Sequence, residues 1–172
     1  MTARTDHAVD VAADIETVWS ITNDLRRWPE LFSEYASVEI LEERPAYVRF
    51  RLTMHPDEQG RVWSWVSERE LDHDAHVVVA RRVETGPFEF MDIRWEYTAL
   101  DASTTRMRWS QEFAMKPTAP VDDEQMAAQR RLRTLQWVVP ALTGSLVVVS
   151  AYASEQMRPE QVGKGVLKRL TP

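Results

Sequence analysis

The 172 residues suffice for one ordinary domain, which at this length buries roughly two-thirds of the surface that its unfolded chain exposes. The net charge of -6 argues against a general nucleic-acid-binding protein, because such domains usually carry a basic excess. Without cysteine the chain can form no disulfide, thiol nucleophile or thiolate metal site, which is compatible with the reducing cytoplasm where we expect the protein.

The first third of the chain predicts a strand followed by two short helices. Segment 1–11 is charged and has no apolar h-region, so we expect no signal peptide. Weak alternation over 7–13 predicts a strand, and Asp14 then supplies an N-cap for a short helix. Pro29 is expected to break that helix, and 30–36 to hold a second short helix or turn.

From residue 38 onward the pattern switches to period two. With 7–13 this makes seven strands at short intervals, which indicates an antiparallel meander. After a linker at 116–120, Asp122 is expected to cap a long C-terminal helix. This order is typical of an α+β fold in which one long helix covers a curved sheet and encloses a cavity. The further candidate strands are 37–43, 46–54, 60–70, 75–84, 89–99 and 104–114.

The chain shows no internal repeat or low-complexity run, so we expect one domain. Its body is residues 1–134, and 135–172 is expected to be an apolar C-terminal helix and tail that forms the lid of the same domain. The run 135–153 contains no charge and is apolar on both helical faces, and Pro140 should kink it. It also meets the length criterion for a membrane span, so membrane contact stays open beside a buried or dimer-packed lid.

One face of the predicted strand 60–70 carries an unusual set of side chains, namely Arg61, Trp63, Trp65, Ser67 and Arg69. Large aromatic rings together with a hydroxyl and a guanidinium suit a pocket for a flat, oxygen-rich ligand. The alternative is that Arg69 lies on a solvated face beside the glutamates that flank it.

The next strands support a lined pocket. Trp95 shares an apolar face with Met91, and Gln111 is a polar group on a face that is otherwise apolar. A buried amide is costly without partners, so Gln111 either bonds a neighbour or meets a polar ligand. Between Arg81 and Arg82, one arginine must face inward, because they have opposite parity on the same strand.

No conventional catalytic set is present. Asp72, His73, Asp74 and His76 could be written as a metal cluster, but loops between strands are routinely polar and no geometry is specified. The five glycines are scattered, so a phosphate-binding loop is not expected. We therefore expect neither a metal nor a cofactor.

Several long motifs resemble the polyketide aromatase/cyclases of type II synthases, especially the tetracenomycin and spore-pigment types. The resemblance covers roughly residues 1–126 and stops after Met126. The motifs are WPELFSEY at 28–35, RVWSWVSER at 61–69, RVETGPF at 82–88, the strand 91–95, and MRWSQEF at 107–113 followed by 115–117.

This resemblance implies a Bet v 1-like or START-like helix-grip fold that takes a poly-β-ketone from an acyl carrier protein. It further implies first-ring aldol closure, typically between C9 and C14, followed by aromatisation. Arg69 and Tyr35 would be the central polar pair of the site. The implied pocket lining is Trp28, Phe32, Ser33, Trp65, Ser67, Arg82, Phe88, Met91, Trp95 and Gln111, to which the face analysis adds Trp63.

The resemblance also implies contact with the ketosynthase/chain-length factor, and no nucleic acid. A homodimer is compatible with the sequence. Arg130, Arg131 and Arg133 are candidates for docking the acidic carrier, or form a solvated helix face. Two other hypotheses remain: a non-catalytic carrier or chaperone of the same fold, and a cyclase tethered to a membrane by its tail.

Overall fold

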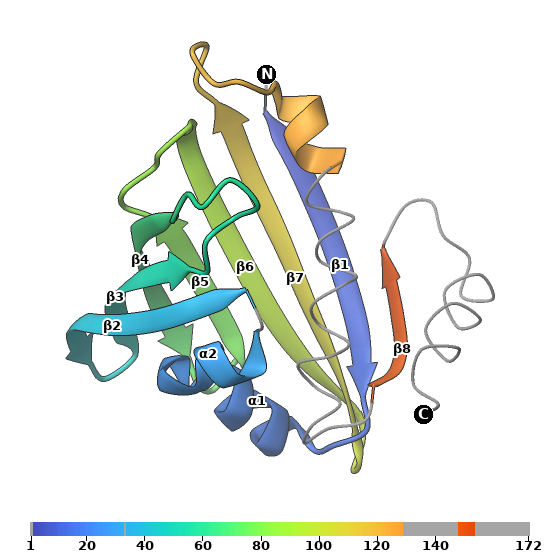
Figure 1. The fold of residues 1–172 in the computed structure, drawn as a ribbon. Coiled ribbons are helices and arrows are strands. Elements are labelled where there is room, and N and C mark those ends of the chain that lie inside the picture. Colours follow the sequence, from blue (N-terminus) through green and yellow to red (C-terminus); the bar gives the residue numbers. More distant parts are fainter. Residues whose placement is uncertain (1, 33, 129–147, 154–172) are drawn as a thin grey trace.

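The computed structural model describes residues 2–32, 34–128 and 148–153 (Figure 1). One antiparallel sheet has the strand order β2-β3-β4-β5-β6-β7-β1-β8. Its strands are β1 Ala3–Val11, β2 Tyr35–Arg44, β3 Tyr47–Met54, β4 Ser64–Asp72, β5 Val77–Arg82, β6 Phe88–Asp101, β7 Thr104–Met115 and β8 Val148–Ala153. The helices are α1 Ile15–Asn23, the 3-10 turn η1 Leu25–Arg27, and α2 Trp28–Leu31.

The seven predicted strands are present as β1 to β7, and consecutive strands from β2 to β7 pair as a meander. The start of β4 differs from the prediction, because residues 60–63 belong to the preceding loop. Asp57 holds this loop by accepting hydrogen bonds from the backbone N–H groups of Gln59 and Arg61, both at 2.9 Å. Gly60 adopts a φ of 75°, which other residues reach only at a steric cost.

Helix α1 begins as predicted. The Asp14 carboxylate accepts from the Thr17 N–H at 3.0 Å, as an N-cap should. Pro29, however, does not separate two helices as expected but lies in the first turn of α2. A proline is tolerated there because the N–H that it lacks would have no helical partner. The second short helix thus ends at Leu31, and Tyr35 already belongs to β2.

The C-terminal helix also begins near its predicted position, since residues 123–128 are helical. Asp122 and Gln125 form a reciprocal cap: the Gln125 N–H donates to the Asp122 carboxylate at 2.8 Å, and the Asp122 N–H donates to the Gln125 side-chain oxygen at 3.3 Å. The proposed docking arginines and residues 135–147 of the expected lid lie outside the described residues. None of the described helices is long and apolar enough to cross a membrane.

The end of the apolar run corrects the sequence prediction. Residues 148–153 were expected to continue the lid helix, but they form β8, which pairs antiparallel with β1 beside Val9 and Ala8. Val148 and Val149 are β-branched, a side-chain shape that favours strands over helices. The sheet therefore has an eighth strand at the β1 edge.

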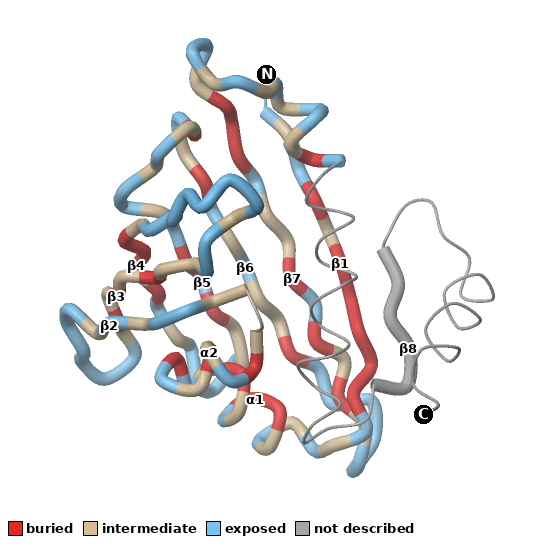
Figure 2. Tube along the Cα trace, in the orientation of Figure 1, coloured by how far each residue is buried: buried red, intermediate tan, exposed pale blue. Residues whose placement is uncertain are grey.

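The buried residues line the inner face of the sheet and the helices that close one end of it (Figure 2). One cluster joins α1 to β1, β5, β6 and β7 through Val18 and Trp19. A second joins α2 to β3 through Trp28 and Phe50, and a third lies at the opposite end around Phe113. Side chains between these clusters line the pocket that is described below.

Candidate active site

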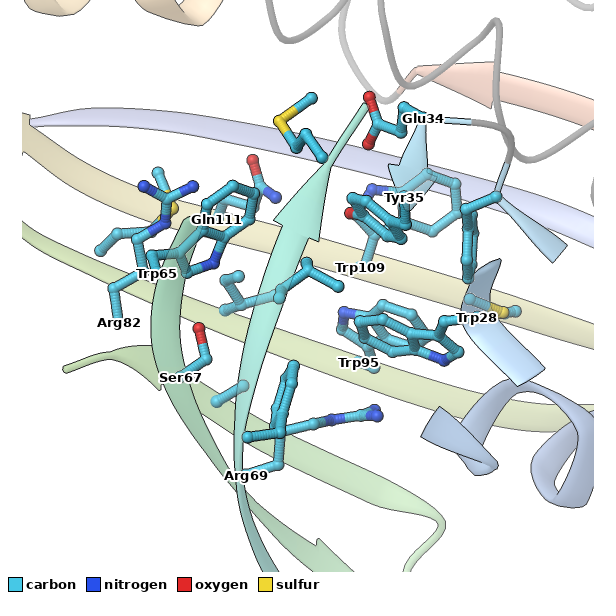
Figure 3. Close-up of a pocket in the computed structure, with 18 of the residues that line it drawn as sticks. Trp28, Glu34, Tyr35, Trp65, Ser67, Arg69, Arg82, Trp95, Trp109 and Gln111 are labelled. Carbon is cyan, nitrogen blue, oxygen red and sulfur yellow. The ribbon is translucent and has the colours of Figure 1, made fainter. Parts of the chain in front are cut away.

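A cavity of about 200 Å³ opens on the inner face of the sheet (Figure 3). A cavity of roughly 150 Å³ is enough to admit a benzene molecule, so one ring of a ligand fits here. The described lining is Trp28, Phe32, Glu34, Tyr35, Phe50, Leu52, Met54, Trp65, Ser67, Arg69, Ala80, Arg82, Met91, Ile93, Trp95, Met107, Trp109, Gln111 and Met126.

Only some of the side chains predicted on the inward face of β4 line the cavity. Trp65, Ser67 and Arg69 line the cavity, as the alternation of the strand requires. Trp63 does not: it lies in the loop before β4 with 48% of its surface exposed. Its indole Nε1 donates to Asp57 at 3.4 Å and Arg61 stacks over its ring, so the loop holds this side chain outside the pocket.

Most of the other predicted lining residues also line the cavity, and one does not. Trp28, Phe32, Tyr35, Arg82, Met91, Trp95 and Gln111 reach the cavity. Phe88 does not line it; the ring is 2% exposed and packs edge-on against Phe113, with Arg82 between it and the cavity. Ser33 lies outside the described residues. Of the two neighbouring arginines on β5, Arg82 lines the cavity and Arg81 lies on the exposed face.

Arg69 lies deep in the site, with 2% of its surface exposed. Its Nη2 donates a 2.7 Å hydrogen bond to the side-chain oxygen of Asn23. The guanidinium lies over two indole rings, 5.1 Å from the centroid of Trp28 and 4.9 Å from that of Trp95. Its Nη1 is buried without a hydrogen-bond partner. This nitrogen is a donor without a partner, on a residue that lines the cavity.

The charge of Arg69 is not balanced by an acid within the described part of the chain. Burial lowers the pKa of its guanidinium to about 10, so it remains a cation at neutral pH. Such a group is costly to bury, and an uncompensated cost of this kind is typical of a functional site.

A polar network behind Arg69 was missed by the sequence analysis. Asn23 at the end of α1 donates to the Trp19 carbonyl at 2.9 Å and lies 3.4 Å from the Tyr97 hydroxyl. That hydroxyl shares a 2.8 Å hydrogen bond with Thr22. Burial raises the pKa of Tyr97 to about 12, so the phenol stays neutral. The available signal was an amide at the end of a helix whose buried residues are Val18, Trp19 and Thr22.

Tyr35, the predicted partner of Arg69, contacts the same tryptophan. Its ring stacks on Trp28 with centroids 5.9 Å apart and planes at 22°. In Figure 3 the Trp28 and Trp95 rings lie between Tyr35 and Arg69. The two polar groups therefore approach the cavity from different sides of one aromatic pair.

A second polar region lies farther along the cavity. The Arg82 guanidinium stacks 3.9 Å above the Trp65 ring centroid. Gln111 accepts a 3.4 Å hydrogen bond from Thr5 and also lines the cavity, so it both bonds a neighbour and faces the space for a ligand. The cavity thus has aromatic walls with polar groups at separate points, an arrangement that orients a ligand with several oxygens.

The histidine loop lies away from the cavity. His73 and His76 contact Trp19 edge-on, and His76 lies 2.9 Å from Glu16 on α1. Among the described residues no group of three histidine or acidic side chains is arranged to hold a metal ion.

Comparison with known proteins assigns this chain to a family. The family model described as polyketide cyclase / dehydrase and lipid transport matches residues 11–138. The chain belongs to this family. This membership confirms the resemblance found in the motifs.

Individual relatives agree. A Streptomyces cyaneus protein named "Putative polyketide cyclase" is 60% identical over 126 residues, which are 73% of this chain and 82% of that protein. The bifunctional cyclase/dehydratase of the actinorhodin polyketide synthase of Streptomyces coelicolor is 30% identical over 112 residues, 64% of this chain and 34% of that protein. These names confirm the prediction of an enzyme of the polyketide cyclase family.

Solved structures confirm the fold. The Zhui aromatase/cyclase from Streptomyces sp. R1128 superposes with a TM-score of 0.70 at 22% identity, covering 99% of this chain and 97% of that one. A START superfamily protein from Mycobacterium smegmatis gives 0.66 at 21% identity over 82% of this chain and 94% of that one. The described part of the chain has a START-like fold, with a seven-strand antiparallel core and short helices.

Proposed function

We propose that this polyketide cyclase binds a poly-β-ketone carried by an acyl carrier protein, closes the first ring by an aldol reaction between C9 and C14, and aromatises it by dehydration. The ketosynthase/chain-length factor would deliver the chain. Arg69 and Tyr35 are the proposed catalytic residues.

The observation that carries this proposal is the state of Arg69. Its guanidinium is buried, has no carboxylate partner among the described residues, and leaves Nη1 without a hydrogen bond. The nitrogen belongs to a residue that lines an aromatic cavity. A donor of this kind favours an oxygen that gains negative charge, because an ionised acceptor roughly doubles the strength of a hydrogen bond.

The aldol step needs such a donor more than it needs a strong base. A methylene between two ketones is already acidic, so the C14 carbanion forms readily and its electron pair attacks the C9 carbonyl carbon. The C9–C14 bond forms, and the C9 oxygen becomes an alkoxide that takes a proton. Arg69 would polarise the C9 carbonyl and stabilise the alkoxide, with Tyr35 as a second donor or proton relay.

Aromatisation then needs no oxidant. Loss of the C9 hydroxyl with a proton from a neighbouring ring carbon releases water and forms a carbon–carbon double bond. Enolisation of the two ketones in the ring, at C11 and C13, completes the aromatic ring. The aromatic walls from Trp28, Trp95 and Trp109 would hold the chain bent in the reactive geometry, since positioning supplies much of the rate in an intramolecular reaction.

The test is reconstitution with a minimal synthase, consisting of the ketosynthase/chain-length factor and a carrier protein. Adding the full chain should shift the products toward compounds with an aromatic ring closed between C9 and C14. An unchanged product profile would contradict the proposal.

The family description also includes lipid transport, which keeps a non-catalytic carrier as the second candidate. A carrier would bind the polyketide or an aromatic analogue but leave the ring pattern and the dehydration of the products unchanged. The same reconstitution, combined with a binding measurement, therefore separates the two functions.

A further inference from the structure

Arg69 is held differently from five other arginines in the described part of the chain. Arg51, Arg81 and Arg106 each bind a carboxylate, as do Arg26 and Arg108. Arg69 binds a side-chain amide instead. An amide oxygen accepts the same hydrogen bond as a carboxylate oxygen but brings no negative charge.

We propose that Asn23 is a positioning residue that fixes the Arg69 side chain without neutralising it, so that the cavity keeps a net cation facing the substrate oxygen. That the cation serves a substrate oxygen rests on the proposed function. That Asn23 leaves the charge of Arg69 unneutralised does not depend on it.

The geometry shows how one nitrogen is fixed and the other left available. Asn23 takes the Nη2 hydrogen bond at 2.7 Å, while Trp28 and Trp95 contact the guanidinium. With Nη2 occupied, Nη1 keeps its donor capacity. Because a guanidinium is planar, fixing one of its nitrogens in this packed site also fixes the other.

The surroundings of Asn23 hold its amide in one orientation. Its Nδ2 donates to the Trp19 carbonyl at 2.9 Å and lies 3.4 Å from the Tyr97 hydroxyl, so its oxygen faces Arg69. Tyr97 stays neutral because burial raises the pKa of its phenol to about 12. The two polar side chains nearest to Arg69 therefore add no counter-charge.

The neighbouring acid on α1 is directed elsewhere. Asp24 follows Asn23 directly, but its carboxylate accepts from the Arg26 N–H at 3.2 Å and caps η1. Asn23 is only partly buried and also borders a surface groove, so a carboxylate at this position should be partly hydrated and compatible with folding. An Asn23→Asp substitution can therefore test charge separately from shape.

The experiment compares two ligands of similar size. 2-Hydroxy-1,4-naphthoquinone is an anion at neutral pH, whereas 2-methoxy-1,4-naphthoquinone is neutral, and both share the same skeleton of two fused rings. The full-length protein should bind the anion more tightly than the neutral compound. Asn23→Asp should lose at least about tenfold in affinity for the anion, because the new carboxylate pairs with Arg69, and should bind the neutral compound as before.

The matched control is Ser20→Asp, which adds the same charge on the exposed side of α1 one turn earlier. It should keep the preference for the anion. Turnover of carrier-bound substrate by Asn23→Asp should fall at saturating substrate as well, because the lost interaction is strongest with the alkoxide.

A second measurement uses the fact that Asn23 is the only asparagine of the chain. Labelling asparagine with ¹⁵N gives one side-chain amide signal, which should shift when the anion binds and shift less with the neutral ligand.

Three results would overturn the proposal: wild-type selectivity in Asn23→Asp, equal loss of both ligands, or failure of Asn23→Asp to fold. If the wild-type chain directs no cyclisation but the ligand selectivity shifts as expected, the proposed function fails and the role of Asn23 stands.

Discussion

Trp28 and Trp95 stack with their ring centroids 5.9 Å apart and their planes within 9° of parallel. One ring comes from α2 and the other from β6, so the pair connects the helical end of the domain to the sheet. The Arg69 guanidinium contacts both rings, and the negative faces of aromatic rings attract a cation. The pair thus forms part of the cavity wall and supports the buried charge at the same time.

Trp95→Leu should weaken both functions of this pair. Loss of the stack and of one cation–π contact should lower the free energy of unfolding by about 1–3 kcal/mol. The product profile should shift toward undirected rings because the wall is smaller. Urea denaturation and product analysis measure the two effects, and an unchanged product ratio would contradict the wall assignment.

Arg69→Met should give a folded protein that is as stable as the wild type or more stable. Burial lowers the pKa of Arg69 well below its ordinary value, to about 10, a cost to the charged form of about 3 kcal/mol at 1.36 kcal/mol per pKa unit. Methionine fills similar space without that cost. Urea denaturation at pH 7 measures the difference, and a large loss of stability would mean that Arg69 is chiefly structural.

The same comparison has a pH dependence. Because the folded pKa lies below the unfolded one, the penalty is fully present below pH 10 and fades as the pH rises above about 10 toward the ordinary pKa of arginine. The advantage of Arg69→Met over the wild type should therefore shrink between pH 9 and pH 11. If the difference in the free energy of unfolding between the variant and the wild type stays constant with pH, this would count against a buried charged guanidinium.

Tyr97→Phe should change the pH dependence in the opposite direction. Burial raises the pKa of Tyr97 from 10.0 to about 12, so the tyrosine contributes stability that is present below pH 10 and lost as the pH rises toward 12. The variant lacks this loss, so its stability should fall less than that of the wild type above pH 10. Near neutral pH it should be less stable by about 1–2 kcal/mol, since Thr22 loses a buried partner.

Trp63 and Trp65 make a matched pair for testing the boundary of the site. Trp65→Ala should alter the product ratio and weaken binding of a naphthoquinone ligand, because Trp65 lines the cavity and supports Arg82. Trp63→Ala should leave both unchanged, because its ring lies on the surface. An equal effect of the two substitutions would contradict the placement of the cavity.

Alternation along the strands was sufficient to predict most of the sheet and most of the inward side chains. It placed Trp95 and Gln111 on the inner face, because period two fixes the face of each residue once one register is known. For Arg69 alternation left a solvated face open, and the resemblance supplied the assignment. It failed for Trp63, where the Asp57 loop ends the alternation before β4 begins. Parity does not show where a strand starts.

Other errors came from tertiary context. Phe88 was implied by the resemblance and not by alternation, since its parity is opposite to that of Met91 and Trp95. A β-bulge between Phe88 and Phe90 shifts the register there, and the ring packs against Phe113 with the Arg82 guanidinium over it. The pairing of Asn23 with Arg69 was missed because the two residues are 46 positions apart and no motif joins them. The strand β8 was missed because an apolar run without charges suits a helix and a buried strand alike.

The central claim is tested most directly by replacing Arg69 in a reconstituted minimal synthase. Arg69→Ala should abolish the shift toward C9–C14 products, and Arg69→Lys should restore little of it, because an ammonium cannot reproduce the planar donor fork. Arg81→Ala is the control, since this arginine binds Glu68 on the other face of the sheet. We predict wild-type products from Arg81→Ala and undirected products from a folded Arg69→Ala protein; wild-type products from Arg69→Ala would contradict the account.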